Sequence, residues 1–339
     1  MNQLKRRTRL LVAASTIAIC TLAAAAAAFG SGGQLGESSP IASNPNQQAI
    51  TYGEQQAAKH FGWTVKTLDA NLSPDKQVSD VDTFINLKVR GIITWTLDPG
   101  AAGAAYKRAL AAGIPIVDFG ATQNVSSTVF DERGYGCSMG NKAAGYIAKR
   151  IPKAKVLVIG GPPVPSITNY TNCFVKAAKA MGLTVLAKQY NVKDTAGTAQ
   201  PIVQDLLTKY PDTQAIWAYN DPSALGAGAV VKSSGKTVWQ EGKSKGVIIM
   251  GANGSADGAA GVKQGVITAT WDPQPETMGR IAVQVLAMHL VSGKPLSALP
   301  KIIVVPMKVW DASNIASYVD PKKRTVVVSP IPAAWIAKK

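Results

Sequence analysis

The fold of this chain is decided by residues 44–71, which read NPNQQAITYGEQQAAKHFGWTVKTLDAN. This stretch predicts a helix over 45–61 that stops at a glycine, followed by a short apolar strand over 63–68. The same order recurs over 75–95 and over 101–117. Helices that alternate with short apolar strands are typical of a parallel sheet covered on both faces. We therefore expect a ligand to bind beyond the carboxyl ends of these strands.

The alternation resumes after a polar segment at 122–134. A chain of 339 residues exceeds the size at which one hydrophobic core keeps growing, so the two halves are expected to form two lobes. Two similar lobes joined by several crossings make a hinge, and hinges flank ligand clefts. In the second half the predicted helices cover 140–150, 172–181, 199–209, 224–233, 259–264 and 275–291, and the predicted strands cover 155–159, 184–186, 215–218, 246–250 and 267–271.

The chain divides into four kinds of segment on this pattern. Its last residues carry a basic cluster, a valine run and a tryptophan, and they fit no repeat, so their placement is not predicted. The predicted boundaries are a signal peptide at 1–30, an N-terminal lobe at 31–124 plus 273–297, a C-terminal lobe at 125–272 plus 298–320, and a C-terminal tail at 321–339.

The N-terminus has the composition of a secretory signal peptide. Four basic residues within positions 5–9 precede an apolar run at 10–22 and an alanine run at 23–28. A membrane anchor is the alternative, because the apolar stretch is nearly as long as the roughly 20 residues that span a bilayer. Export would place the protein in a periplasm or at the outer face of the cytoplasmic membrane.

The chain is strongly basic, with a formal net charge of +16. Removal of the signal peptide leaves 32 Lys and Arg against 20 Asp and Glu, a net charge of +12. A basic balance can indicate nucleic-acid binding, but the lysines are spread along the helices and no basic stripe with interleaved aromatic residues occurs. We expect no nucleic-acid partner and a solvated basic surface, which favours contact with an anionic membrane or cell wall.

Two cysteines, Cys137 and Cys173, remain after the signal peptide. An exported protein meets oxidising conditions, in which a pair of cysteines forms a disulfide more often than in the cytosol. Both residues precede or begin predicted helices of the same lobe, which makes their approach plausible. The geometry of a disulfide is not readable from sequence, so a bridge and two separate thiols both stay open.

Short motifs recur along the chain in a specific order and spacing: Asn44-Pro45 with Gly53 and Gly62, Asp69-Ala70-Asn71 with Gln77, Ala112-Gly113-Ile114-Pro115, Asn220-Asp221 with Ala224-Leu225-Gly226-Ala227, and Pro275 to Gly279. Together they resemble the type I periplasmic binding proteins of the ribose- and galactose-binding group, over about residues 44–293. The resemblance implies an α/β fold of two Rossmann-like, doubly wound parallel-sheet lobes joined by a multi-strand hinge. It also implies a monomer that captures a small solute, most simply a sugar or sugar-like molecule, and delivers it to a membrane ABC permease.

The resemblance also places three amide side chains in the cleft. Asn44 stands where the family uses an asparagine in its first cleft loop. Asn220 matches the cleft asparagine of the second lobe, and Asn253 stands where the sugar binders keep an aspartate. All three are expected to contact the ligand.

Five residues and one strand depart from the family pattern. Asn46 and Gln47 occupy the places of two stacking aromatic residues, and Thr168 that of a ligand-binding arginine. Gly120-Ala121 replaces an Asp-Arg pair that grips sugar hydroxyls. The first strand, at 34–39, is polar where the family has an apolar one, so either it is a degenerate edge strand or the alignment shifts there.

Aromatic residues offer replacements for these losses. Trp95 ends a predicted strand, and Trp271, with Asp272 beside it, lies near the hinge. Tyr170 and Tyr219 add hydroxyl groups. The ligand is then a sugar stacked on tryptophan or a flatter, less hydroxylated solute, unless the tryptophans are ordinary core or rim residues.

Other functions have weaker support. The sequence GCSMG at 136–140 matches the G-x-S-x-G pattern of a nucleophile elbow, which makes a secreted esterase that uses Ser138 a remote alternative. Such an enzyme needs a histidine on a loop, yet His60 and His289 both lie in predicted helices. The two helical histidines and the two distant cysteines show no metal-ligand spacing, so no catalysis, metal or cofactor is expected. A sensor or co-receptor for a non-sugar solute remains the alternative to an importer subunit.

Overall fold

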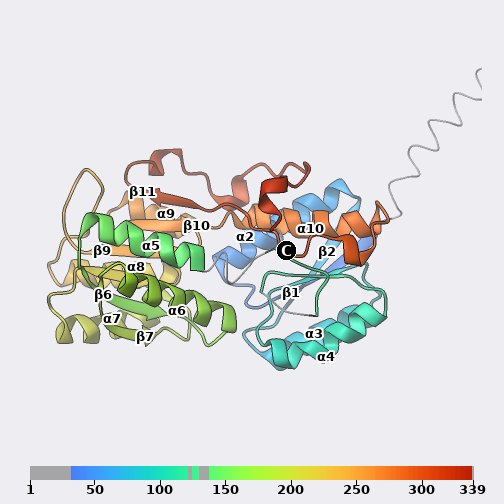
Figure 1. Ribbon diagram of the computed structural model, residues 1–339, viewed down its shortest axis with the longest axis horizontal. Helices are drawn as coiled ribbons and strands as arrows, with labels where there is room; N and C mark the ends of the chain where they lie inside the picture. Colours follow the sequence, from blue (N-terminus) through green and yellow to red (C-terminus); the bar gives the residue numbers. More distant parts are fainter. Residues whose placement is uncertain (1–31, 121–123, 130–136, 338–339) are drawn as a thin grey trace, which may run out of the picture.

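The computed structural model describes residues 32–120, 124–129 and 137–337, which form two lobes side by side (Figure 1). The predicted signal peptide lies outside the described residues. The first lobe contains a parallel sheet with the order β2-β1-β3-β4-β5. Its strands are β1 (Gly33–Ser39), β2 (Trp63–Asp69), β3 (Ile92–Thr94), β4 (Ile116–Asp118) and β5 (Ser127–Thr128).

Helices cover both faces of this first sheet. In Figure 1, α3 and α4 lie below the sheet of this lobe and α2 and α10 lie above it. Helix α10 comes from the far end of the chain, so the first lobe is completed by a late segment. The helices are α2 (Pro45–His60), α3 (Pro74–Asn86), α4 (Pro99–Ala111) and α10 (Pro275–Leu290).

The second lobe repeats the same plan. Its sheet has the order β11-β10-β9-β8-β6-β7 and is parallel except for β11, which runs antiparallel to β10. Read from β7, the second sheet runs β7-β6-β8, which is its second strand, then its first, then its third, as β2-β1-β3 does in the first sheet. The predicted pair of doubly wound lobes is therefore confirmed. The elements are β6 (Lys155–Gly160), β7 (Thr184–Tyr190), β8 (Ala215–Ala218), β9 (Ile248–Ala252), β10 (Ala269–Asp272), β11 (Lys308–Asp311), α5 (Cys137–Arg150), α6 (Pro165–Ala180), α7 (Ala196–Lys209), α8 (Asp221–Ser233) and α9 (Ala256–Lys263).

Helices α2 and α10 cross at two glycines. A Cβ atom on Gly53 would lie 2.0 Å from the carbonyl oxygen of Glu276, and one on Gly279 would lie 2.1 Å from that of Ile50. No side chain fits at either position, so the two backbones approach each other directly. This contact fixes α10 to the first lobe immediately after the chain leaves the second.

Strand β1 corrects the expectation of a degenerate edge strand. It pairs with β2 on one side and β3 on the other, so it lies inside the sheet. Its polar side chains Glu37 and Ser38 are buried and find partners within the lobe. Glu37 accepts hydrogen bonds from Thr51 at 2.6 Å and from Thr67 at 2.7 Å, and Ser38 donates to Asp80 at 3.0 Å. The hydrophobic pattern missed this strand because hydrogen bonds replace apolar contacts around it.

The chain crosses between the lobes several times, and two crossings differ from the predicted boundaries. Strand β5 belongs to the first sheet, although it follows the boundary placed at residue 124. Ile302 pairs with Thr128 in the first lobe, whereas β11 pairs in the second, so the segment around 304–307 is itself a crossing. Sheet membership therefore assigns part of 298–320 to each lobe.

The C-terminal tail returns from the second lobe to the first, along α10. Arg324 donates to the carboxylate of Asp272 at 2.6 Å and pairs with Glu276 at 3.2 Å. Further along, Ile336 forms an antiparallel bridge with Ile303. The tail thus joins the hinge region to the first lobe. The tail contains the short 3₁₀ turns η4 (Pro321–Lys323) and η5 (Ala333–Trp335), and two more, η2 (Leu296–Ala298) and η3 (Ile315–Ser317), flank β11 before it.

A disulfide joins Cys137 to Cys173. It links the first residue of α5 to the middle of α6, two helices on one side of the second sheet (Figure 1). The sequence left open whether the two cysteines form a bridge or stay as separate thiols, and the structure contains the bridge. Among the described helices, none combines the length and the hydropathy that a membrane span requires.

Candidate functional site

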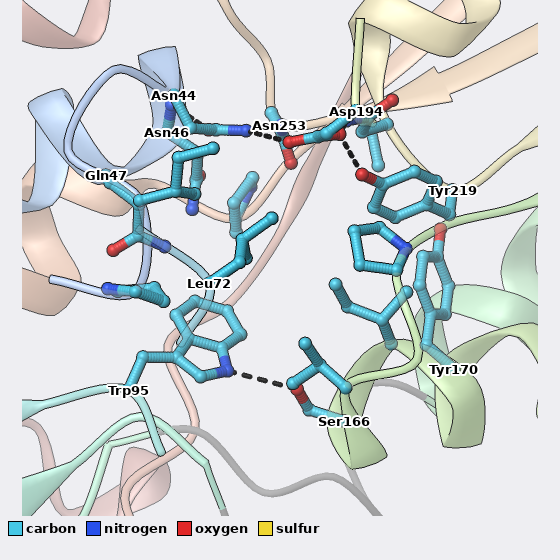
Figure 2. Close-up of a pocket in the computed structure, with 18 of the residues that line it drawn as sticks. Asn44, Asn46, Gln47, Leu72, Trp95, Ser166, Tyr170, Asp194, Tyr219 and Asn253 are labelled. Atoms are coloured by element: carbon cyan, nitrogen blue, oxygen red, sulfur yellow. Dashed lines mark hydrogen bonds between the residues drawn. The ribbon is translucent and has the colours of Figure 1, made fainter. Parts of the chain in front are cut away.

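A cavity of about 110 Å³ lies between the two lobes. Most of the residues that line it follow the carboxyl ends of strands, at the point where each sheet reverses its order, as the fold predicts. Figure 2 shows side chains of both lobes directed into this space. The lining includes Pro40, Ile41 and Asn44 after β1, Leu72 after β2, Trp95 and Leu97 after β3, Pro162, Val164 and Ser166 after β6, Asp194 after β7, Tyr219 and Asn220 after β8, and Asn253 after β9.

Asp194 connects the two lobes across this cavity. Its Oδ2 atom accepts a hydrogen bond from Nδ2 of Asn44 in the first lobe at 2.9 Å. Its Oδ1 atom accepts from the hydroxyl of Tyr219 and from Nδ2 of Asn220 in the second lobe. Burial raises the pKa of Asp194 to about 6, although the hydrogen bonds from Asn44 and Asn220 lower it.

Trp95 makes the second contact between the lobes at the cavity. Its indole Nε1 donates to Oγ of Ser166, at the start of α6, over 3.1 Å (Figure 2). The loop that carries Trp95 is held by the buried side chain of Gln77. Nε2 of Gln77 donates to the carbonyl of Trp95 at 2.9 Å, and its Oε1 accepts from the backbone of Leu97 at 2.8 Å. The indole is therefore presented from a fixed backbone.

Asn44 and Asn220 play matching parts in the two lobes. Each is the N-cap of the helix that follows a strand, where a short polar side chain satisfies an exposed backbone N–H. Oδ1 of Asn44 accepts from the backbone of Asn46 at 2.9 Å, and Oδ1 of Asn220 accepts from that of Ser223 at 3.0 Å. With the oxygens engaged by the helices, both Nδ2 groups point toward Asp194. The same cap chemistry thus positions an amide donor on each side.

Eight of the predicted ligand residues line the cavity. Two of them carry buried polar atoms without a hydrogen-bond partner among the described residues, namely Oδ1 of Asn46 and the hydroxyl of Tyr170. Buried polar groups of this kind are usually satisfied, so both are suited to meet a ligand. Their contact with a ligand stays a prediction. The eight are Asn44, Asn46, Gln47, Trp95, Tyr170, Tyr219, Asn220 and Asn253.

Three predicted residues do not reach the cavity. Thr168 lies on α6 between the lining residues Ile167 and Tyr170, and the helical rotation turns it away from their face. Trp271 is buried in the main hydrophobic core. Asp272 is fully buried at the hinge, where it accepts hydrogen bonds from Nε1 of Trp310 at 2.8 Å and from the tail. Asp272 thus has structural partners, whereas Nε1 of Trp271 is buried without a hydrogen-bond partner among the described residues.

Asp194 was missed because strand β7 was predicted to end at residue 186. The strand continues to Tyr190, and its last residues are exposed and polar because β7 lies at the edge of the sheet. Apolar patterning does not mark such a strand end. A signal was nevertheless present, since Asp194 precedes a threonine that caps the next helix, in the kind of loop where cleft residues are expected.

The geometry gives no support to the esterase alternative. Ser138 is the second residue of α5 in the second lobe, and Gly136 of its motif lies outside the described residues. His60 ends α2, and His289 lies in α10 with Nδ1 2.8 Å from the carbonyl of Lys294. Both histidines thus belong to helices of the first lobe. Within the described parts of the chain, no three His, Cys, Asp or Glu side chains are grouped so that they could hold a metal ion.

Comparison with known proteins shows which family has this two-lobed architecture. The periplasmic binding protein domain model matches residues 36–295. The ribose import binding protein of Bacillus subtilis (strain 168) is 32% identical over 279 residues, which cover 81% of this chain and 86% of that protein. The xylitol-binding protein of Mycolicibacterium smegmatis is 26% identical over a match that covers 73% of this chain and 69% of that protein.

A solved structure shows the same fold. The Caulobacter myo-inositol binding protein, bound to myo-inositol, superposes with a TM-score of 0.73 at 22% sequence identity, over 85% of this chain and 96% of that one. Its likeness extends over both lobes, whereas the match to the domain model covers the chain from within β1 to just beyond α10. On these matches and on its two doubly wound lobes, the chain belongs to the periplasmic binding protein family.

Proposed function

We propose that this protein captures a sugar or a sugar-like solute between its lobes and delivers it to an ABC importer. The observation that carries the proposal is the cavity at the carboxyl ends of the strands of both sheets, with polar and aromatic side chains from each lobe. A ligand there contacts both lobes only when they are closed, so binding shifts the population toward the closed form. Closure in turn gives a membrane permease a distinct shape to recognise.

The relatives support the sugar class and the transport role. The names of the two relatives mention ribose import and xylitol, and the Caulobacter structure holds myo-inositol. All three molecules are small and polyhydroxylated. For this chain the proposal extends to export by the N-terminal segment, action in a periplasm or at the outer face of the cytoplasmic membrane, and a monomeric state. It includes no catalytic step.

Calorimetric titration of the purified protein with pentoses, hexoses and polyols tests the proposal. We expect saturable binding at one site per chain for at least one of them. Trp95→Ala should weaken that binding at least tenfold, because the indole lines the cavity and contacts the opposite lobe. Tyr190→Ala is the matched control, since Tyr190 is an exposed aromatic residue outside the cavity. Absence of binding across the panel, or equal affinity in the Trp95 variant, would overturn the assignment.

A further inference from the structure

We infer that the cleft selects solutes that carry a protonated amine, such as amino sugars, and that the carboxylate of Asp194 is the partner of the ammonium group. The inference rests on the proposed function, because it names the ligand class of the same cavity. Figure 2 shows Asp194 at the boundary of the cavity, between the side chains of the two lobes.

The first observation is the charge of the cavity lining. Among its described residues Asp194 is the one ionisable acid, and the lining contains no lysine, arginine or histidine. The three donors to Asp194 are two amides and a phenol, all of them neutral. Its chain neighbour Lys193 is exposed, and the described residues include no ion pair to Asp194. The carboxylate is thus partly withdrawn from solvent, and no cation among the described residues compensates its charge, a costly state that a cationic ligand would relieve.

The second observation is the hydrogen-bonding capacity that Asp194 retains. A carboxylate offers about four lone-pair sites. Oδ1 accepts two hydrogen bonds, but Oδ2 accepts one, from Asn44. One acceptor site therefore remains on the oxygen that faces the first lobe. A hydrogen bond from an ammonium to this site is charge-assisted and about twice as strong as one from a neutral hydroxyl.

The third observation is the rest of the lining, which also suits an amine. Tyr219 touches Asp194, and Trp95 and Tyr170 line the same cavity, so three aromatic rings surround the space. Cations are attracted to aromatic faces. Oδ1 of Asn46 is a buried acceptor without a partner among the described residues, which again calls for a donor on the ligand. A carboxylate or phosphate ligand would meet Asp194, and no cationic side chain among the described lining residues would offset the repulsion.

Matched sugars test the inference. Glucosamine and galactosamine are each titrated into the purified protein at pH 7 beside glucose and galactose, which differ from them in one substituent. N-acetylglucosamine serves as the uncharged amine derivative. At least one amino sugar is expected to bind at least tenfold more tightly than its hydroxyl parent, and the acetylated derivative is expected to lose this advantage.

The variant Asp194→Asn tests whether Asp194 is the partner of the ammonium group. Asp194 has a φ of 60°, a left-handed conformation that asparagine also tolerates, so the substitution removes the charge with little change in the backbone. We expect the variant to bind an amino sugar and its parent within about threefold of each other. Asp205→Asn, which removes an exposed carboxylate from α7, should leave the full preference in place.

The outcomes distinguish a failure of the amine inference from a failure of the proposed sugar-binding function. Parent sugars that bind as tightly as the amino sugars would overturn the inference and leave sugar binding intact. An amine preference that survives in Asp194→Asn would overturn the role of Asp194. Absence of binding by every sugar in the panel would overturn both. The comparison on the unchanged protein does not depend on how the variant folds, so it decides the ligand class by itself.

Discussion

At the scale of single residues, Glu54 is a fully buried carboxyl group of α2 that interacts with Glu37 of β1. Burial, and then the charge of Glu37, raise the pKa of Glu54 well above its usual range. A group whose pKa is raised on folding favours the folded state at low pH, and this contribution is lost as the pH rises through the raised pKa. Glu54 therefore destabilises the fold at neutral and alkaline pH.

Glu54→Gln should raise the free energy of unfolding at pH 8 relative to the unchanged protein. The gain should shrink toward pH 4, where the carboxyl group is largely neutral in both states. Urea unfolding of the two proteins at both pH values measures the difference. Asp205→Asn, an exposed control, should show no such trend. A gap between Glu54→Gln and the unchanged protein that is equal at pH 4 and pH 8 would contradict the assignment.

Asn220 combines a structural role with a role in the cavity. Its side chain caps α8 and donates to Asp194, so Asn220→Ala should cost roughly 1 kcal/mol of stability and also weaken ligand binding. Asp98→Ala removes the exposed N-cap of α4 and should lower stability without a change in affinity. Thermal unfolding and calorimetric titration of both variants check this. Equal affinities in the two variants would remove Asn220 from the binding site.

At the scale of elements, the tail depends on one arginine. Arg324 pairs with Asp272 and Glu276, and all three side chains are largely buried. Loss of one partner of a buried ion pair leaves an uncompensated charge, so Arg324→Ala should cost roughly 3 kcal/mol. Arg108→Ala removes an exposed pair with Asp82 and should cost less than about 1 kcal/mol. Similar melting temperatures for the two variants would show that the ion pairs of Arg324 with Asp272 and Glu276 do not stabilise the fold.

The disulfide should act on the second lobe. It closes a loop with a sequence separation of 36, which corresponds to about 3–4 kcal/mol of stabilisation in the chain-entropy account. The double variant Cys137→Ser, Cys173→Ser should therefore unfold at a lower temperature than the unchanged protein. A reducing agent should lower the melting temperature of the unchanged protein and leave that of the double variant as it is. Identical melting of the oxidised protein and the double variant would contradict this.

The helices and strands show how far the sequence predicts this fold. Apolar strands such as β3 and β8 were found because burial on both faces demands continuous hydrophobic residues. The expectation that β1 is a degenerate edge strand was wrong, because its buried polar side chains form hydrogen bonds with side chains that are distant in sequence. Helix α6 begins at Pro165, seven residues before the predicted start at 172, because proline fits the first turn of a helix and does not mark a break there.

At the scale of the whole molecule, the position of the site could be predicted more fully than its chemistry. The repeated topology places the cavity at the carboxyl ends of two sheets, and Trp95 follows from its place at a strand end. Asn44 and Asn220 come from the resemblance to the binding-protein family. Asp194 could not be anticipated from local pattern alone. Its role depends on donors from both lobes, Asn44 on one side and Tyr219 on the other, and such a meeting is a property of the assembled molecule.

The central claim is that a ligand is held between the two lobes, and a distance between them tests it most directly. Spin labels on Lys107→Cys in α4 and Lys176→Cys in α6 report this distance, since both positions are exposed and lie on helices of different lobes. The measurement compares the protein alone with the protein saturated by the sugar that binds in calorimetry. We predict a narrower distribution at shorter distance with the ligand. An unchanged distribution at saturation would contradict the account, because it would place the ligand outside the cleft.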